Sequence, residues 1–349
     1  MVSPRPIEVV KVRGSHREVG RQIGEACAKV IRHSARGFDD PAKLERAARC
    51  REITSATIPW VVEEHDGAAE AAGVDPLVLF SASLEDSFVE LAAGTPNVLR
   101  GRCSDLVAAP PASANGHLLV AHNNDLYERN EEQLVAIERE VPGDPRVFTI
   151  GIGPWPSVGW NSAGISFTGN ELTPNDTKIG IPVILQFRAM LSQQTTDAAV
   201  GLALHHERAS SYNNLIADRN GGVVNIEGSA TEAELTEPDD DGLLAHTNHY
   251  ACERMLPREG DPEYAKRSAV RLRRAIELLE EARGSMTEGS LRAMLSDHEN
   301  NPDSLCRHPA SADEPKTVFW CIADVTDMRI TYGRGNPCLS EAPVQQYGF

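Results

Sequence analysis

A change in residue pattern near residue 100 constrains the fold more than any other feature of the sequence. Before it, helical patterns extend over 42–57, 59–72 and 76–91, separated by Gly73 and by Pro76. After it, from Cys103 onward, short apolar runs alternate with turn signals of the Asn-Gly type, which is a strong hairpin signal. Helices followed by strands in hairpins predict an α+β fold rather than an alternation of strand and helix.

Helical patterns also interrupt the strand-rich region, at 182–191, 196–205 and 264–282. Near the N-terminus, Ser15 and Glu18 have the spacing of a capping box, which predicts the start of a helix there. In the segment 264–282 the expected apolar face consists of Leu272, Ala275, Ile276 and Leu279.

Composition limits the classes of function. The chain has 349 residues, 41% hydrophobic and 24% charged, which is typical of a globular protein of one large or two ordinary domains. Its formal charge of −17 argues against nucleic acid or an anionic membrane as a partner. The N-terminus lacks the apolar core of a signal peptide, and the seven cysteines include no CxxC pair. We therefore expect reduced thiols, a cytoplasmic location and no transmembrane segment.

Cys103 has an unusual context, although the ordinary interpretation of a single cysteine is core packing. It follows an Arg-Gly-Arg step, precedes Ser-Asp and begins the strand-rich region. We hypothesise that the chain cuts itself between Arg102 and Cys103. The freed Cys103 would then carry a thiol nucleophile and an α-amino base on one residue.

Polar clusters recur where apolar runs end, and a buried polar group there needs a partner. They occupy 122–125, 168–171, 246–250 and 304–309. Each is also compatible with an ordinary Asx turn or a structural role. In a functional interpretation, a carboxylate of these clusters holds a nearby ammonium group, and their side-chain amides donate hydrogen bonds to an oxyanion that develops during the reaction.

The histidines and cysteines of the last two clusters raise the question of a zinc site. An HxxH pattern on a strand or loop without a second well-spaced pair is a weak metal signal, so we expect no metal. The residues considered are His246, His249, His298, Cys306 and His308.

The ordered set of motifs resembles the N-terminal-nucleophile hydrolase family that includes acyl-CoA:6-aminopenicillanate acyltransferase (isopenicillin N acyltransferase). Each motif alone is weak, but their order along nearly the whole chain is specific. The matching segments are 13–24 (RGSHREVGRQIG), Cys103, 123–125 (NND), 164–170, 246–249 (HTNH), 305–308 (LCRH) and 335–338 (GNPC).

This resemblance implies a four-layer αββα sandwich made as one precursor, a zymogen. Self-cleavage would give a mostly helical α chain, 1–102, and a catalytic β chain, 103–349, within one structural domain. Two positions depart from the family pattern. Arg102 stands where the family usually has glycine, and His122 stands where hydrolase relatives have arginine. Ser229 is the nearest candidate for the serine that assists maturation in the family.

The resemblance also implies roles for individual residues. Cys103 is the expected nucleophile, and Asp125 would orient its α-ammonium group. Asn170 and Asn248 would donate to the oxyanion, and Arg307 would bind carboxylates unless it forms a structural ion pair. The expected substrate-binding residues are His122, Asn124, His249 and His308.

The expected activity is autoproteolytic acyltransferase or amidohydrolase action on the C–N amide or thioester bond of a small N-acyl or peptide-like substrate. A dedicated hydrolase of amino-acid conjugates and an unprocessed, non-catalytic scaffold are the alternatives. No cofactor is expected, although a coenzyme A thioester is a candidate acyl donor. The expected partners are the small-molecule amide or acyl donor and the two chains of the same precursor, with higher oligomers left open.

Overall fold

The computed structural model describes residues 5–84, 102–309, 311, 314–339 and 343–349. Two sheets form its centre. The larger sheet has eight strands in the order β1-β4-β5-β6-β7-β8-β9-β10, and the smaller has six in the order β11-β2-β3-β12-β13-β14. Pairing is antiparallel in both sheets except between β1 and β4.

The larger sheet contains both the N-terminal strand and the central part of the chain. Its strands are β1 (Glu8–Arg13), β4 (Leu134–Glu140), β5 (Val147–Ile152), β6 (Trp155–Asn161), β7 (Ile165–Asn170), β8 (Asn213–Asp218), β9 (Val223–Gly228) and β10 (Ala233–Thr236). The smaller sheet consists of β2 (Arg102–Ala108), β3 (Leu119–Tyr127), β11 (Leu243–His246), β12 (Pro315–Asp324), β13 (Arg329–Arg334) and β14 (Val344–Gly348).

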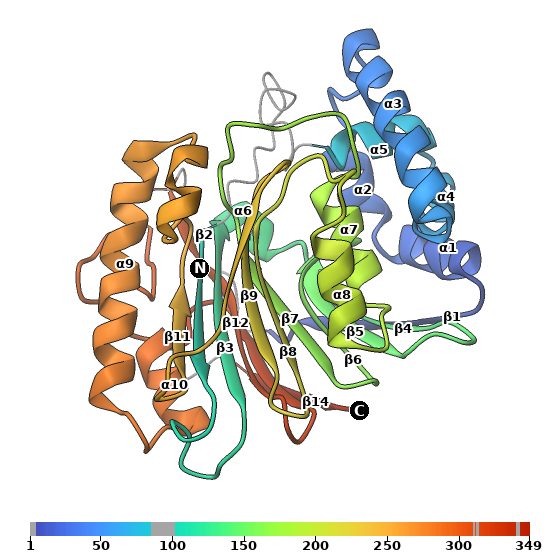
Figure 1. Ribbon diagram of the computed structural model, residues 1–349. Coiled ribbons are helices and arrows are strands. Elements are labelled where there is room, and N and C mark those ends of the chain that lie inside the picture. The colour runs from blue at the N-terminus through green and yellow to red at the C-terminus, as the bar shows by residue number, and fades with distance from the viewer. Residues whose placement is uncertain (1–4, 85–101, 310, 312–313, 340–342) are drawn as a thin grey trace.

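Helices cover the outer face of each sheet (Figure 1). The larger sheet carries α1 (His16–Ala26), α2 (Ala28–Ser34), α3 (Pro41–Thr57), α4 (Pro59–Ala72), α5 (Pro76–Ala82), α7 (Val183–Met190) and α8 (Thr196–Ala203). The smaller sheet carries α9 (Pro262–Glu281) and α10 (Glu288–Leu295). The short helix α6 (Glu128–Glu131) and a 3₁₀ helix (Glu253–Arg258) lie in connections.

Three buried interfaces hold the layers together. Side chains of both sheets, among them Val120 and Phe148, pack between the two sheets. Leu106 of the smaller sheet packs with Leu279 and Leu291 of its covering helices. A third cluster joins the larger sheet to α3, α5, α7 and α8. Apolar burial on this scale is the main force that stabilises such a fold. The predicted α+β class and the αββα order of layers are confirmed.

The helical leader is packed into the body of the protein. Its strand β1 pairs with β4 along six residues. The predicted capping box is present, since the Ser15 side chain accepts from Glu18 N–H and the Glu18 carboxylate accepts from Ser15 N–H. Gly20 of α1 lies so close to α4 that a Cβ there would be 1.9 Å from the Glu64 carbonyl oxygen. The glycines of segment 13–24 therefore allow the close approach of two helices.

One helix is shorter than predicted within the described residues. The pattern at 76–91 predicts a single helix, whereas α5 ends at Ala82. The remainder of that prediction, and the residues just before the cleavage dipeptide, lie outside the described part of the chain. None of the described helices is both long enough and apolar enough to cross a membrane.

Candidate active site

The pairing of β2 with β3 brings together the residues that the sequence placed at the cleavage site and at the Asn-Asn-Asp motif. Cys103 lies opposite Asn124, and Arg102 lies opposite Asp125. Because successive side chains of a strand alternate between its faces, Cys103 and Asn124 share one face and Arg102 and Asp125 share the other. Cys103 is 5% exposed, and Asp125 is fully buried.

The backbone of Cys103 is held at both its nitrogen and its oxygen. Its N–H donates to Asn248 Oδ1 at 2.7 Å, and its carbonyl oxygen accepts from Arg271 Nη1 at 2.8 Å. Arg271 Nη2 also donates to Asn248 Oδ1, at 2.9 Å. Asn248 is itself fixed, since its N–H donates to Ser268 Oγ and its Nδ2 donates to the Glu171 carbonyl oxygen. The nitrogen of residue 103 thus has a well-oriented acceptor.

Cys103 lines a small cavity of about 90 Å³, together with residues of both sheets and of α7. Asn124 Nδ2 lies 3.6 Å from Sγ. Burial raises the pKa of the thiol well above its usual value, and the carboxylates of Asp125, Asp105 and Glu171 add to this effect. The resting residue therefore holds a protonated thiol. The rest of the cavity lining is largely apolar, with Leu126, Ile152, Trp155, Pro156, Ser157, Gly169, Ile184, Phe187 and Tyr212.

A chain of buried polar groups leads from the sulfur through Asn124 to His122 and Asp105. Asp105 and His122, both fully buried, lie opposite each other on β2 and β3, and His122 Nδ1 is 2.8 Å from Asp105 Oδ1. His122 Nε2 lies 3.5 Å from Asn124 Nδ2. Donation from Nδ1 to the carboxylate leaves Nε2 as an acceptor for the Asn124 amide. Asn124 thus lies between His122 and the sulfur of Cys103 in this series of contacts.

Asp125 lies on the other face of β3, among cationic side chains. Thr317 Oγ1 donates to its Oδ1 at 2.7 Å, and Arg307 Nε lies 3.9 Å from its Oδ2. Burial raises the pKa of this carboxyl group, although Arg307 and Arg271 oppose the shift. Burial likewise lowers the pKa of Arg307 to about 10, with Asp125 opposing. Arg307 therefore forms an ion pair with Asp125, a contact that fits both of its predicted roles, in the site and as a structural ion pair.

The side chain of Arg102 has a defined position. Its guanidinium carbon is 5.0 Å from the centre of the Tyr264 ring, and its Nη1 lies 3.7 Å from Asp303 Oδ1. Asp303 also pairs with Arg307, at 3.6 Å. The arginine that replaces the usual glycine is therefore accommodated by specific contacts.

Asn170 ends strand β7, between the cavity-lining residues Gly169 and Glu171. Its Oδ1 accepts from Asn213 Nδ2 at 3.1 Å and lies 2.9 Å from His246 Nδ1. Its Nδ2 is buried and has no hydrogen-bond partner among the described residues. A fixed amide with a free donor is the arrangement that an oxyanion donor requires, and Asn170 lies next in the chain to two lining residues without lining the cavity itself.

Three other predicted residues lie elsewhere. His249 Nδ1 contacts Ser268 Oγ at 3.0 Å, and burial lowers the pKa of His249 to about 4. The contacts described for His308 are with His298, Cys306 and Cys338 rather than with Cys103. Ser229 donates to Asp176 Oδ2 at 2.8 Å within a turn.

Arg271 was missed by the sequence analysis, because the apolar face predicted for α9 was only partly correct: Ala275 and Leu279 are buried, but Ile276 is not. The buried residues of this helix are Ser268, Arg271, Ala275 and Leu279, and Ile276 is 42% exposed. Arg271 lies three residues after Ser268 and four before Ala275, so all three share one face of the helix. This spacing is the sequence signal that could have identified Arg271 as a buried cation.

A larger surface depression of about 990 Å³ does not contain this site. It lies between the start of α1 and the β4–β5 turn, and charged residues such as Arg13, Glu18 and Asp144 line it. The nucleophile candidate Cys103 and its neighbour Asn124 instead line the smaller cavity.

The similarity of this chain to known structures is low. A Caenorhabditis elegans N-acylethanolamine-hydrolyzing acid amidase ortholog is 17% identical over 69% of this chain and 95% of its own, with a TM-score of 0.47. A variant of the conjugated bile acid hydrolase from Clostridium perfringens is 11% identical over 70% and 92%, with a TM-score of 0.47. Penicillin V acylase from Agrobacterium tumefaciens is 12% identical over 71% and 86%, with a TM-score of 0.42. Values this low do not by themselves support a conclusion about this chain.

Sequence comparison gives a stronger result at the level of the family. No curated protein matches the chain. The profile of the acyl-coenzyme A:6-aminopenicillanic acid acyl-transferase family matches residues 112–338, which include Asn124, Asp125, Asn170, Asn248 and Arg271 but begin after Cys103. Because this match covers most of the chain, the protein belongs to the acyl-coenzyme A:6-aminopenicillanic acid acyl-transferase family.

Proposed function

We propose that this protein cuts its own chain between Arg102 and Cys103 and then acts as an N-terminal-cysteine acyltransferase or amidohydrolase. Its substrate would be the C–N amide, or thioester, of a small N-acyl or peptide-like molecule, and the reaction would proceed through an acyl-enzyme. Membership of the acyltransferase family supports the reaction class.

One observation carries the assignment of Cys103. Its nitrogen is bound by Asn248 Oδ1 at 2.7 Å, while its sulfur lines an apolar cavity beside Asn124. A residue of this kind presents a base and a nucleophile together once the bond before it is broken. Core packing, the ordinary role of a buried cysteine, does not account for the oriented amide acceptor at its nitrogen.

Self-cleavage would begin with attack of Cys103 Sγ on the carbonyl carbon of Arg102. The C–N bond between the two residues breaks, the thiol proton passes to the leaving nitrogen, and a thioester forms. Water then hydrolyses the thioester, which leaves a carboxylate on Arg102 and a free thiol and amine on Cys103. The contacts of Arg102 with Tyr264 and Asp303 support this step, because they fix the residue that carries the scissile carbonyl.

In the mature enzyme the α-amine of Cys103 would take the thiol proton. Its ordinary pKa of about 7.7–8.0 suits a base at neutral pH. A base is needed because burial and nearby carboxylates keep the thiol protonated. Asn248 Oδ1 would hold the amine, and Asp125, whose Oδ2 accepts no hydrogen bond from the described residues, would supply a compensating negative charge.

The sulfur would attack the substrate carbonyl, and the resulting oxyanion needs donors. The free Nδ2 of Asn170 supports its expected role as a donor. Asn248 Nδ2 is engaged with the Glu171 carbonyl, so we assign Asn248 to the nitrogen of Cys103 instead of to the oxyanion. Asn124 Nδ2, 3.6 Å from Sγ, is a second candidate donor.

The lining is largely apolar, with Asn124 and Glu171 among its few polar residues, so it favours a substrate with an apolar acyl group. The acyl-enzyme would pass its acyl group to water or to an amine. A coenzyme A thioester is a candidate acyl donor, and the chemistry needs no cofactor.

Intact-mass spectrometry of the purified protein tests self-cleavage directly. We expect two species that divide the chain between residues 102 and 103, with residue 103 as the new N-terminus, and a single full-length species for Cys103→Ala. Incubation with a panel of N-acyl amides and acyl-CoA thioesters should give an acyl adduct on Cys103. An uncleaved wild-type protein that turns over substrate would contradict the mechanism, and an uncleaved, inactive one would support a scaffold role.

A further inference from the structure

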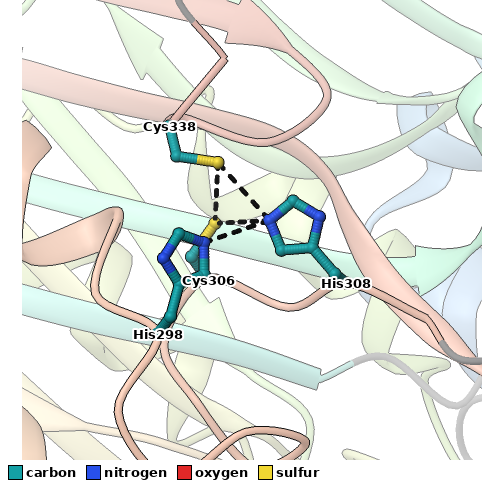
Figure 2. A group of neighbouring side chains, drawn as sticks. All are labelled: His298, Cys306, His308 and Cys338. Atoms are coloured by element: carbon teal, nitrogen blue, oxygen red, sulfur yellow. Dashed lines mark hydrogen bonds between the residues drawn. The ribbon is translucent and has the colours of Figure 1, made fainter.

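Four metal-binding side chains meet outside the candidate active site, in the loops that flank α10, β12 and β13. They are His298, Cys306, His308 and Cys338, and their ligand atoms all lie within 4.8 Å of one another. Figure 2 shows the two imidazoles and two thiols directed toward a common point. The sequence analysis considered three of these residues with His246 and His249, but those two histidines have other partners.

Three of the four distances given for this Cys/His cluster fall in the range of a tetrahedral zinc site, and the fourth, between the two imidazoles, is slightly shorter. The two sulfur atoms are 3.6 Å apart, and the two imidazole Nε2 atoms are 3.1 Å apart. His308 Nε2 lies 3.4 Å from Cys338 Sγ and 3.7 Å from Cys306 Sγ. Zinc bonds of about 2.3 Å to sulfur and about 2.0–2.1 Å to nitrogen place tetrahedral ligands roughly 3.3–3.8 Å from one another.

We propose that His298, Cys306, His308 and Cys338 bind one Zn²⁺ ion in a structural site. Two thiolates and two imidazoles form a donor set that selects zinc by both softness and geometry. Four protein ligands fill a tetrahedral coordination sphere and leave no position for a reactive water. The site therefore differs from the catalytic zinc of a metallohydrolase.

A neighbouring side chain supports a metal-bound thiolate at Cys306. Asn336 is 2% exposed, and its Nδ2 lies 3.4 Å from Cys306 Sγ and 2.7 Å from the Arg307 carbonyl oxygen. An amide N–H directed at a cysteine sulfur is the kind of contact that orients a metal ligand.

The site has a structural consequence for the chain around it. Cys306 and His308 flank Arg307, whose guanidinium contacts Asp125. Cys338 comes from the segment after β13, and His298 comes from the segment after α10. A zinc ion would join these three segments and fix the backbone on both sides of Arg307.

Metal analysis of the full-length protein, purified and then equilibrated with Zn²⁺ and freed of excess metal by gel filtration, tests the proposal. We expect about one zinc ion per chain in the wild type. Cys338→Ser and His298→Gln should each lose most of this zinc. Both residues are at least partly exposed, so the fold should tolerate these changes.

Two control variants and a second probe sharpen the test. Cys252→Ser and His206→Gln alter a cysteine and a histidine outside the cluster and should retain the zinc. Co²⁺ in place of zinc should give the strong visible absorption of a tetrahedral site with thiolate ligands in the wild type and in Cys252→Ser, and lose it in Cys338→Ser.

Three outcomes would overturn the proposal. They are wild-type protein without stoichiometric zinc after equilibration, equal zinc retention in Cys338→Ser and Cys252→Ser, or a Cys306–Cys338 disulfide in a non-reduced digest of the wild-type protein as purified, before any metal is removed. None of these readouts requires enzymatic activity, so the result is independent of the proposed function.

Discussion

Asn248 Oδ1 accepts hydrogen bonds from two donors, the backbone N–H of Cys103 at 2.7 Å and Nη2 of Arg271 at 2.9 Å. One amide oxygen thus connects the candidate nucleophile to a cation that is 1% exposed. If the nitrogen of residue 103 becomes an amine, it will keep this acceptor, and its protonated form will lie near the positive charge of Arg271.

We expect Asn248→Ala to lower kcat by about 10²-fold, because the nitrogen of Cys103 would lose its orienting acceptor. KM should change little, since the apolar cavity is not altered. Steady-state kinetics of the cleaved protein measure both constants. Asn220→Ala, in an exposed turn, is the control. A rise in KM with kcat unchanged would indicate instead that Asn248 stabilises the bound substrate and the transition state equally.

Arg271→Gln should move the acid limb of the kcat/KM profile to higher pH. A nearby positive charge favours the neutral amine, so its removal raises the pKa of the α-amine. Arg271→Lys keeps the charge and should keep the limb closer to that of the wild type. An unchanged limb in Arg271→Gln would show that this arginine does not influence the titrating base.

Replacement of Cys103 by serine should leave slow self-cleavage but remove most turnover, because a hydroxyl is a poorer nucleophile than a thiol at neutral pH. Cys103→Ala should abolish both reactions. Mass spectrometry follows cleavage, and product release follows turnover. Cys321→Ser, which alters another buried cysteine, controls for loss of packing. Wild-type turnover in Cys103→Ser would exclude the thiol as the nucleophile.

Asp105→Asn should lower the pKa of the Cys103 thiol. The Asp105 carboxylate is one of the charges that raise this pKa, and asparagine can still accept from His122 Nδ1. The pH dependence of Cys103 alkylation, read by peptide mass spectrometry, measures the shift. An alkylation profile that coincides with that of the wild type would mean that Asp105 exerts no charge effect on the sulfur.

The protein should lose stability as the pH falls from about 6.5 toward about 4, in part because of His65. Burial lowers the pKa of His65 to about 4 in the folded state, so the unfolded state binds more protons in this window. The contribution to the free energy of unfolding is on the order of 3 kcal/mol.

His65→Gln tests this, since glutamine can keep a contact with Ser83 Oγ, which lies 3.1 Å from His65 Nε2. Its urea-unfolding free energy should depend less on pH than that of the wild type. His206→Gln, with a side chain 83% exposed, should show the wild-type dependence. Parallel curves for wild type and His65→Gln would assign the acid sensitivity to other groups.

The sequence predicted the parts of the site that depend on local pattern. Cys103 and the Asn124-Asp125 pair lie on consecutive strands, so a hairpin-like pairing of β2 with β3 brings them together. Asn170 ends a strand and Asn248 closely follows one, positions at which an apolar run gives way to polar residues.

The parts that were missed depend on distances across the fold. Arg271 belongs to α9, whose buried stripe contains Ala275 and Leu279 as predicted but continues to Arg271, a residue that the predicted apolar face did not include. Cys338 joins Cys306 only because β12 and β13 form a hairpin between them. The spacing of 32 residues between Cys306 and Cys338 does not by itself indicate that the hairpin brings the two cysteines together.

Strand β2 begins at Arg102, so the proposed cut would fall inside a hydrogen-bonded strand and not in a loop. Fresh chain ends usually fray, because few contacts restrain them. Here residues 103–108 pair with β3, and residues 105–108 also pair with β11. A terminus created at this point would be motionally restrained from the moment it forms, so the entropy of ordering the nucleophile would already have been lost during folding of the precursor.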